Sequence, residues 1–207
     1  MGEGTNLEIV FQDFLPEEHR EAATQLMLDA FEDKLIPVLG KDARANILIN
    51  KGMRPSNCIS ASVDGKLAGI LAFRDHESGF IELNLRDIIR TYGLIGGLKK
   101  AIGLSLLDHH STFGECYVDC IAVARDERGR GIGNRLLEML EERARLAGNS
   151  RLTLAVIDTN TRAKALYHRF GFVDAKVVSM WPLDKLFGFP FKRVTYMEKR
   201  ISRPSMD

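Results

Sequence analysis

The sequence has almost no net charge with which to attract a polyanion. Its 207 residues include 29 Lys and Arg against 28 Asp and Glu, so the formal net charge is +1. Binding to DNA or RNA depends on neutralising phosphates with a clear excess of basic residues. We therefore expect no nucleic acid among the partners.

Cysteine is scarce and is not spaced for disulfide or metal chemistry. Cys58, Cys116 and Cys120 are an odd number of thiols and include no CxxC pair. The run Asp108-His109-His110 lacks a spaced set of further ligands, so it is weak evidence for a metal site. This pattern predicts reduced thiols in a cytoplasmic protein and no metal cofactor.

Long apolar runs are also missing. The longest candidate, 85–107, is interrupted by charged residues and four glycines, and no run reaches the roughly 18 residues of a membrane span. Residues 1–6 are polar and glycine-rich, unlike a signal peptide, and Asn6 departs from the myristoylation pattern. We expect no membrane partner.

The first half of the chain alternates strand and helix signals. A strand is predicted over 7–11, a helix from Pro16 and a second helix over 42–50. The run 59–73, with Asp64-Gly65 at its centre, predicts a hairpin. Residues 80–83 are a candidate strand. Glycines are expected to break 86–110 into two short helices.

The second half predicts a buried strand over 115–124, a glycine-rich turn and an amphipathic helix. A strand over 152–157 and a short helix capped by Asn160 follow. Two closing strands, 172–180 and 191–199, are joined by an aromatic loop. With 45% apolar residues and no repeat or linker, the chain is expected to form one domain.

The glycine-rich turn is Arg128-Gly129-Arg130-Gly131-Ile132-Gly133, between the apolar run Ile121-Ala122-Val123 and the helix that starts near Asn134. Helix N-termini bind anions through unpaired N–H groups, and glycine lets the backbone approach a ligand closely. The arginines add cationic donors. The turn therefore predicts a site for a phosphate-bearing cofactor, although a glycine-rich connection without a ligand is an alternative.

Two better-known phosphate turns do not fit. A dinucleotide-binding turn needs G-x-G-x-x-G, but its third glycine would fall on Asn134 or on Leu136, depending on the register. A P-loop fails because no Gly-Lys-Ser/Thr follows.

The pattern that does fit is R-x-x-G-x-G, formed by Arg128, Gly131 and Gly133. After Ile121-Ala122-Val123 and before an amphipathic helix, it resembles the acetyl-CoA motif of the GNAT family of N-acetyltransferases. Downstream, Asn160, Ala163, Ala165-Leu166-Tyr167 and Phe170-Gly171-Phe172 resemble the next motif of that family. The two motifs cover about 115–172. Arg125 stands where the family often has proline.

The resemblance implies one α/β domain over 1–207, with a mixed, mostly antiparallel sheet flanked by helices and a V-shaped cofactor cleft. It also implies direct transfer of an acetyl group from acetyl-CoA to an amine, without a covalent enzyme intermediate. A non-catalytic acyl-CoA sensor and a longer-chain acyltransferase are the alternatives. The acceptor stays open among small amines, antibiotics, polyamines, amino acids and protein amines.

By the same resemblance, the CoA pyrophosphate sits on the backbone amides of 129–134, with Arg128 and Arg130 either near its phosphates or facing solvent. The pantetheine arm pairs with strand backbone, and Asn160 bonds the arm or only caps its helix. The residues implied for acetyl-CoA are Ile121, Ala122, Val123, Arg128, Gly129, Arg130, Gly131, Ile132, Gly133, Asn134, Asn160, Ala163 and Tyr167.

Tyr167 is the residue that the resemblance assigns as general acid for the leaving CoA thiolate. The alternative is an aromatic core residue at helical spacing. A backbone N–H near Ile121 would polarise the thioester carbonyl.

Two acids are candidates for the group that accepts the proton of the amine. A period of two puts Glu115 and Asp119 on one face of the strand with Tyr117 and Ile121, and Cys116 and Cys120 on the other. Either acid accepts the proton directly or through water, or else has a structural role. The thiols are expected to be buried.

Two segments are candidates for the acceptor side. The insertion 85–112 precedes the cofactor strand, where the family often builds its acceptor wall. The aromatic loop 181–191 is a candidate for closing the same cleft or for a homodimer contact.

Overall fold

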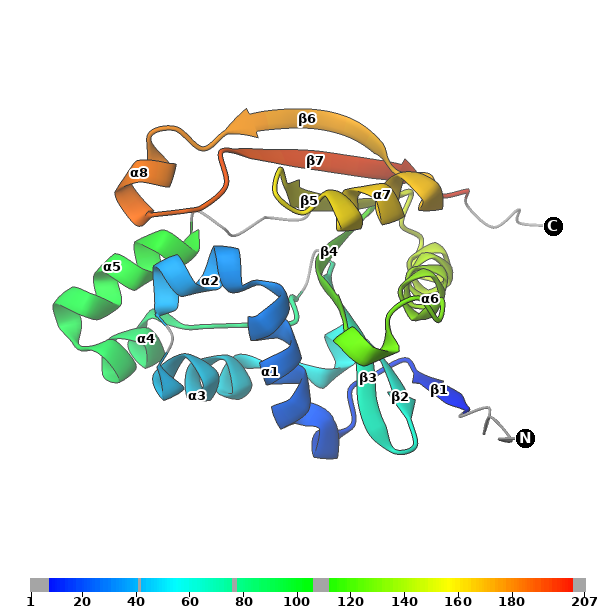
Figure 1. Cartoon of the computed structure of the whole chain (residues 1–207), viewed down its shortest axis with the longest axis horizontal. Helices are drawn as coiled ribbons and strands as arrows, with labels where there is room; N and C mark the ends of the chain where they lie inside the picture. Colours follow the sequence, from blue (N-terminus) through cyan, green and yellow to red (C-terminus); the bar gives the residue numbers. More distant parts are fainter. Residues whose placement is uncertain (1–7, 41, 76–77, 106–111, 203–207) are drawn as a thin grey trace.

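The computed structural model describes residues 8–40, 42–75, 78–105 and 112–202, which form a seven-stranded sheet with helices on both faces (Figure 1). The strands are β1 (Ile9–Gln12), β2 (Cys58–Val63), β3 (Lys66–Arg74), β4 (Glu115–Val123), β5 (Arg151–Ile157), β6 (Val173–Ser179) and β7 (Arg193–Arg200). The helices are α1 (Arg20–Ala30), α2 (Glu32–Leu39), α3 (Ala43–Gly52), α4 (Leu85–Tyr92), α5 (Leu94–Ser105), α6 (Ile132–Leu146), α7 (Thr161–Phe170) and α8 (Leu183–Phe187).

The sheet is mixed, as predicted, with the order β1-β2-β3-β4-β5-β7-β6. Among the strands of the described residues, β4 and β5 pair in parallel and the other neighbours pair antiparallel. Helix α6 connects the parallel pair, because parallel neighbours need a long crossover. The glycine turn lies where β4 passes into that crossover.

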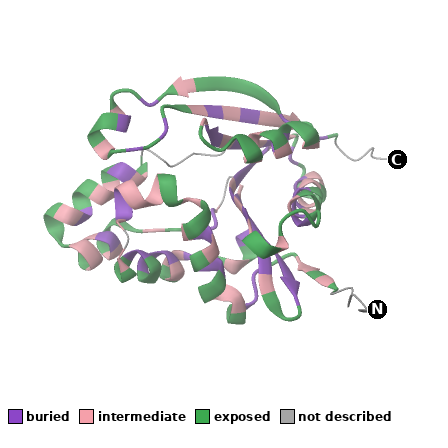
Figure 2. Cartoon of the chain, viewed as in Figure 1, coloured by how far each residue is buried: buried purple, intermediate pink, exposed green. Residues whose placement is uncertain are grey.

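The two faces of the sheet carry separate apolar clusters, and strands β2, β3 and β4 between them are mostly buried (Figure 2). Leu136 and Leu140 of α6 pack on one face with Phe172. Met27 of α1 and Leu48 of α3 pack on the other. The stripe on α6 agrees with the sequence pattern, since residues four apart share a face of a helix.

Strands β4 and β5 separate part of the way along their length. Their pairing runs from Glu115↔Arg151 to Val118↔Leu154, yet β4 continues to Val123 and β5 to Ile157. Beyond this point the inner edge of β4 no longer faces a hydrogen-bonded strand. The expected V-shaped opening is therefore present.

A β-bulge in β4 changes which side chains share a face. The register with β3 shifts between Ala72↔Cys120 and Phe73↔Val118, so Asp119 is the extra residue. A bulge inserts one residue and reverses the alternation beyond it. The period-two expectation holds for Tyr117 and Asp119, which line the same cavity, and is wrong from Cys120 onward: Cys120 lies on the same side as Asp119, and Ile121 packs in the opposite cluster.

Several local predictions are confirmed and others are not. The hairpin turns at Asp64 and Gly65, both with positive φ. The stretch 80–83 is not a strand and contributes one isolated bridge from Ile81 to Met53. Helix α2, which the sequence analysis missed, begins directly after α1.

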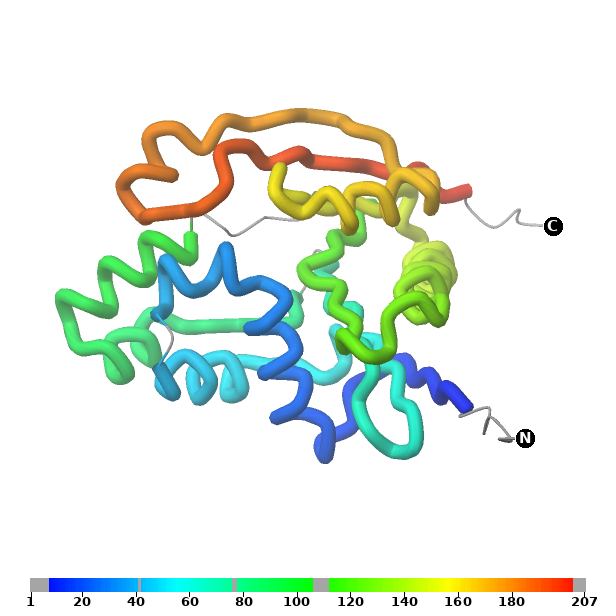
Figure 3. The backbone as a smooth tube through the Cα atoms, in the orientation of Figure 1, coloured from blue at the N-terminus to red at the C-terminus, as the bar shows by residue number. Residues whose placement is uncertain are grey.

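The insertion forms two helices, as predicted. Within the described residues, Gly93 is the one glycine that separates them. Gly97 lies inside α5. A glycine is needed there because a Cβ would come within 2.7 Å of the Ile89 Cα on α4. The tube in Figure 3 shows α5 lying beside α2, while α4 contacts α3. The insertion therefore extends the helical layer on the Met27 face of the sheet.

The aromatic loop packs on the protein and does not stand apart from it. Phe189 and Phe191 are buried with Val38 of α2 and Ile157 of β5. The loop contains the short helix α8, while Trp181 is 74% exposed. In the described parts of the chain, no helix has the length and apolar character to cross a membrane.

The close approach of α4 and α5 generates a stability prediction. Gly97→Ala should lower the free energy of unfolding by about 1–3 kcal/mol, because the new methyl group overpacks the Ile89 backbone. Gly96→Ala is the matched control on the same helix, since its Cβ would meet only a Tyr92 side-chain atom, at 3.8 Å. That control should be neutral or stabilising by up to about 1 kcal/mol. Chemical denaturation measures both, and equal effects would contradict the packing argument.

Candidate active site

A cavity of about 540 Å³ lies where β4 and β5 separate. Its walls come from β4, the glycine turn, the start of α6, the end of β5 and α7. The predicted cofactor residues that line it are Ile121, Ala122, Val123, Arg128, Gly129, Gly131, Ile132, Gly133, Asn134, Asn160, Ala163 and Tyr167. We call this space the donor cavity.

The glycine turn presents open backbone to the donor cavity. Gly129 and Gly131 have φ values of 87° and 81°, which side chains rarely adopt, and a Cβ at either position would meet no atom within 4 Å. Gly131 is the N-cap of α6, and no side chain caps this helix among the described residues. The first N–H groups of α6 lack partners within the helix. The turn therefore suits an anionic ligand such as a phosphate.

The side chains of the two arginines of the turn both bind other groups of the protein. Arg128 Nε donates to the Val123 carbonyl at 3.0 Å, and Arg130 is ion-paired with Glu127. Arg128 lines the donor cavity, but Arg130 is not among its lining residues. Of the two, Arg128 is therefore the one placed to meet a phosphate.

The inner edge of β4 supplies the long wall of the donor cavity. On its outer edge, Ile121 and Val123 are paired with Leu71 and Gly69 of β3. On the inner edge, pairing with β5 ends at Val118. An open strand edge can pair with an extended molecule that carries amides, such as a pantetheine arm.

Helix α7 forms the far wall of the donor cavity. The Asn160 side chain accepts a hydrogen bond from Ala163 N at 3.1 Å, which confirms the predicted cap. Tyr167 is buried against Phe172, with ring centroids 5.9 Å apart. Burial raises the pKa of Tyr167, so its hydroxyl keeps its proton at neutral pH.

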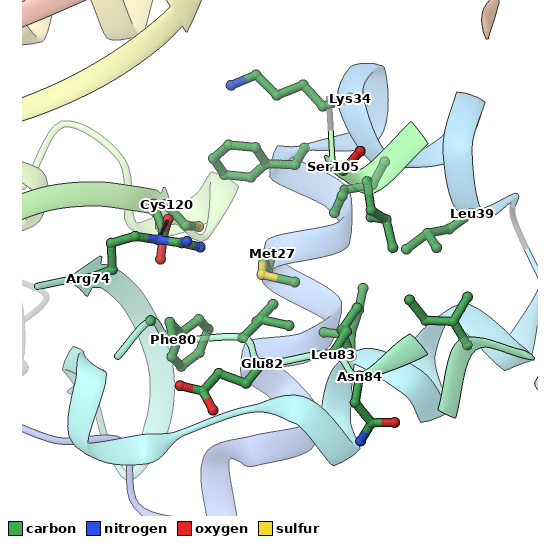
Figure 4. A pocket seen from close by; sticks show the side chains of 18 of the residues that line it. Met27, Lys34, Leu39, Arg74, Phe80, Glu82, Leu83, Asn84, Ser105 and Cys120 are labelled. Atoms are coloured by element: carbon green, nitrogen blue, oxygen red, sulfur yellow. Dashed lines mark hydrogen bonds and ion pairs between the residues drawn. The ribbon is translucent and has the colours of Figure 1, made fainter. Parts of the chain in front are cut away.

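A second cavity of about 820 Å³ opens on the Met27 face of the sheet (Figure 4). Apolar side chains from α1, α2, α3, α4 and α5 line it, with the stretch 78–85 along one side. We call it the acceptor cavity. Helices α4 and α5 of the insertion contribute to its walls, whereas no residue of 181–191 lines either cavity.

The two cavities meet at one place. Four residues line both of them: Phe31, which is the N-cap of α2, Lys34 of α2, and Asp119 and Cys120 of β4. The bulge in β4 turns Asp119 and Cys120 toward this junction. A group held in one cavity can therefore reach a group held in the other.

The two acids proposed from the sequence have different surroundings. Asp119 lies at the junction, where its Oδ1 accepts a hydrogen bond from Arg74 Nε at 2.9 Å. Glu115 is 5% exposed and accepts hydrogen bonds from Thr112 and Thr153. It lines neither cavity.

The thiols are buried and free, as the sequence analysis expected. Burial raises the pKa of Cys58 and of Cys116 to about 12, and raises the pKa of Cys120 well above its ordinary value. Since the thiolate is the nucleophile, the protonated Cys120 at the junction is unsuited to attack a thioester.

Phe31 and Lys34 are the site residues that sequence reasoning missed. Lys34 belongs to α2 and Phe31 is the N-cap residue of that helix, which is positioned by its contacts with α1 and α5. The available signal was a lysine that directly precedes the apolar run 35–39. No cluster suited to a metal ion occurs in the described ranges, and Asp108-His109-His110 lie outside them.

A family model described as the acetyltransferase (GNAT) family matches residues 11–172. An acetyltransferase of Agrobacterium fabrum is 38% identical over 93 residues, which are 44% of this chain and 61% of that protein. The thialysine N-epsilon-acetyltransferase of Bos taurus is 38% identical over 65 residues, which are 31% of this chain and 38% of that protein. The matches thus span less than two thirds of either curated relative.

Solved structures of low sequence identity share the fold. The ribosomal-protein-S18-alanine N-acetyltransferase of Escherichia coli has a TM-score of 0.60 at 17% identity, with 97% of this chain and 98% of that chain covered. A GNAT acetyltransferase of Streptococcus pneumoniae has a TM-score of 0.58 at 20% identity, with 94% and 100% covered. With its splayed strands, its glycine turn and a family match over most of its length, the chain belongs to the GNAT family of acetyltransferases.

Proposed function

We propose that this protein transfers the acetyl group of acetyl-CoA to a primary amine by direct attack. The observation that carries the proposal is the junction at which the donor and acceptor cavities share Asp119. The family uses acetyl-CoA as its donor, and the open glycine turn and unpaired strand edge fit that molecule. The acceptor amine would enter through the acceptor cavity.

The donor cavity supplies three kinds of contact. Backbone N–H groups at the start of α6 and the side chain of Arg128 would hold the pyrophosphate. The edge of β4 at Ile121 and Val123 would pair with the pantetheine amides. Bound acetyl-CoA supplies an acetyl thioester, whose carbonyl oxygen a β4 N–H would stabilise as negative charge develops.

Tyr167 is the proposed general acid. It lines the donor cavity on α7, and its buried hydroxyl is protonated at neutral pH. A proton from its hydroxyl would neutralise the leaving thiolate. Burial of Cys120 as a protonated thiol supports direct attack by the amine without an acyl-cysteine step.

Asp119 is the proposed acceptor of the amine proton, directly or through water. It lies at the junction on the bulge of β4, and Arg74 holds one of its carboxylate oxygens. Glu115 is the less well placed acid, because its carboxylate accepts hydrogen bonds from Thr112 and Thr153 outside both cavities. The acid at the bulge is the better placed of the two.

Donor binding is tested at the N-terminus of α6. Gly131→Asp should weaken acetyl-CoA binding more than about tenfold, since a carboxylate would occupy the anion site. Gly148→Asp is the matched control: it lies just past the other end of α6, also has positive φ and also faces open space. Isothermal titration calorimetry with acetyl-CoA measures both. Equal affinity of the two variants would refute the donor site.

The general acid is tested by removing one hydroxyl. Tyr167→Phe should lower kcat about 10²-fold or more while the Kd for acetyl-CoA stays nearly constant. Tyr92→Phe, which removes a buried hydroxyl outside both cavities, should leave kcat unchanged. Release of CoA thiol with a panel of polyamines, amino acids and peptides provides the assay. Normal turnover by Tyr167→Phe on an accepted amine would exclude the assignment.

A pair of amide substitutions distinguishes the roles of Asp119 and Glu115. Asp119→Asn should lower kcat/KM about 10²-fold or more, because a carboxamide cannot accept the proton. Glu115→Gln should leave kcat/KM close to that of the parent but lower the melting temperature, since it disturbs buried hydrogen bonds. Steady-state kinetics and thermal unfolding on both variants decide the matter. The reverse pattern would move the role to Glu115.

A further inference from the structure

Lys34 lies at the junction of the two cavities and has no role in the proposed transfer to an acceptor amine. It projects from α2 (Figure 4), and its Nζ donates to the Ala155 carbonyl of β5 at 3.5 Å. Residue 155 is the first position of β5 beyond the last pair with β4. The lysine therefore extends across the mouth of the gap between the separated strands.

The amine of Lys34 is held loosely. A distance of 3.5 Å is longer than the usual N–H···O hydrogen bond, and the Phe31 ring lies 5.4 Å from the same nitrogen. Burial in the cleft lowers the pKa of Lys34 to about 8, with Cys120 and Asp119 opposing the shift. A large share of the side chain is then neutral at mildly alkaline pH, and the neutral amine is the nucleophilic form.

Lys100 provides the contrast. Its Nζ donates to the carbonyl oxygens of Val38 and Leu39 at 2.9 and 2.8 Å and lies over the Tyr92 ring. Lys100 lines neither cavity. The two lysines thus differ in their access to the donor cavity.

We propose that Lys34 is a self-acetylation site, at which the protein acetylates its own side chain when the acceptor cavity is empty. The proposal rests on the proposed function, because it needs the same bound thioester. What carries it is the position of Lys34 in the lining of both cavities, on the side from which an acceptor amine would approach.

The chemistry is a second use of the acetyl-transfer site. The neutral Nζ forms a bond to the thioester carbonyl carbon, and the bond from that carbon to sulfur breaks. The proton lost from nitrogen passes to Asp119, and the thiolate takes a proton from Tyr167. The products are an acetylated Lys34 and free CoA, with no further reactant.

Acetylation would change the junction in two ways. The side chain loses its positive charge and gains the bulk of an acetyl group at the place where the cavities meet. Both changes act on an incoming amine, so the modified protein should turn over more slowly. An excess of acceptor amine should in turn protect Lys34.

The test uses the full chain incubated with acetyl-CoA alone, followed by peptide mass spectrometry over time. Acetylation of Lys34 should be at least about tenfold faster than that of Lys100. Its rate per molecule should not change on dilution, because a lysine inside the cleft reacts within its own chain. In Gly131→Asp the Lys34 rate should fall to that of Lys100, whereas Gly148→Asp should retain it.

Three results would overturn the proposal. They are equal rates at Lys34 and Lys100, a Lys34 rate that Gly131→Asp does not lower, and no Lys34 acetylation in a protein that binds acetyl-CoA and acetylates an added amine. Calorimetry with acetyl-CoA distinguishes a failure of the self-acetylation proposal from a failure of the proposed function. If neither binding nor amine acetylation occurs, both proposals fail together.

Discussion

Strands β4 and β5 begin as a parallel pair and then separate, and the site depends on the backbone groups that this leaves along β4. Pairing ends at Val118 and Leu154, although both strands continue. Backbone N–H and C=O groups need partners, so an open inner edge favours a ligand that can pair with it. The glycine turn at the end of β4 places an uncapped helix N-terminus beside that edge. Strand edge and helix terminus together make a long, polar wall.

The bulge at Asp119 connects this wall to the other side of the sheet. Because the bulge reverses the alternation of β4, Asp119 and Cys120 face the same junction while Ile121 packs under α6. Lys34 of α2 and its N-cap residue Phe31 close the junction. One extra residue in a strand thus brings a carboxylate to the point where two cavities meet. Burial then separates the roles of the nearby groups: it keeps Tyr167 and Cys120 protonated and lowers the pKa of Lys34.

The parts of the site that local chemistry dictates were readable from the sequence. Gly129 and Gly131 adopt positive φ, which glycine tolerates, and Asn160 caps α7 through its own side chain. The hairpin at Asp64-Gly65 follows the same logic. The strand assigned to 80–83 failed, because a short apolar run does not reveal whether a partner strand is available. Gly97 was read as a helix breaker, yet it lies inside α5, where it permits a close contact with Ile89 of α4.

By itself the sequence determined the donor side: a glycine turn between a strand and an amphipathic helix, with Asn160 and Tyr167 downstream. These features are encoded by residues that are close together in the chain. Only the tertiary structure decided the second cavity on the Met27 face, the different surroundings of Asp119 and Glu115, and the position of Lys34. Those depend on a bulge, whose register is set by pairing with β3, and on α2, which packs against strands about 85 and 120 residues away in the chain. Contacts between such distant segments have no signature in local spacing, because packing and pairing across the sheet create them.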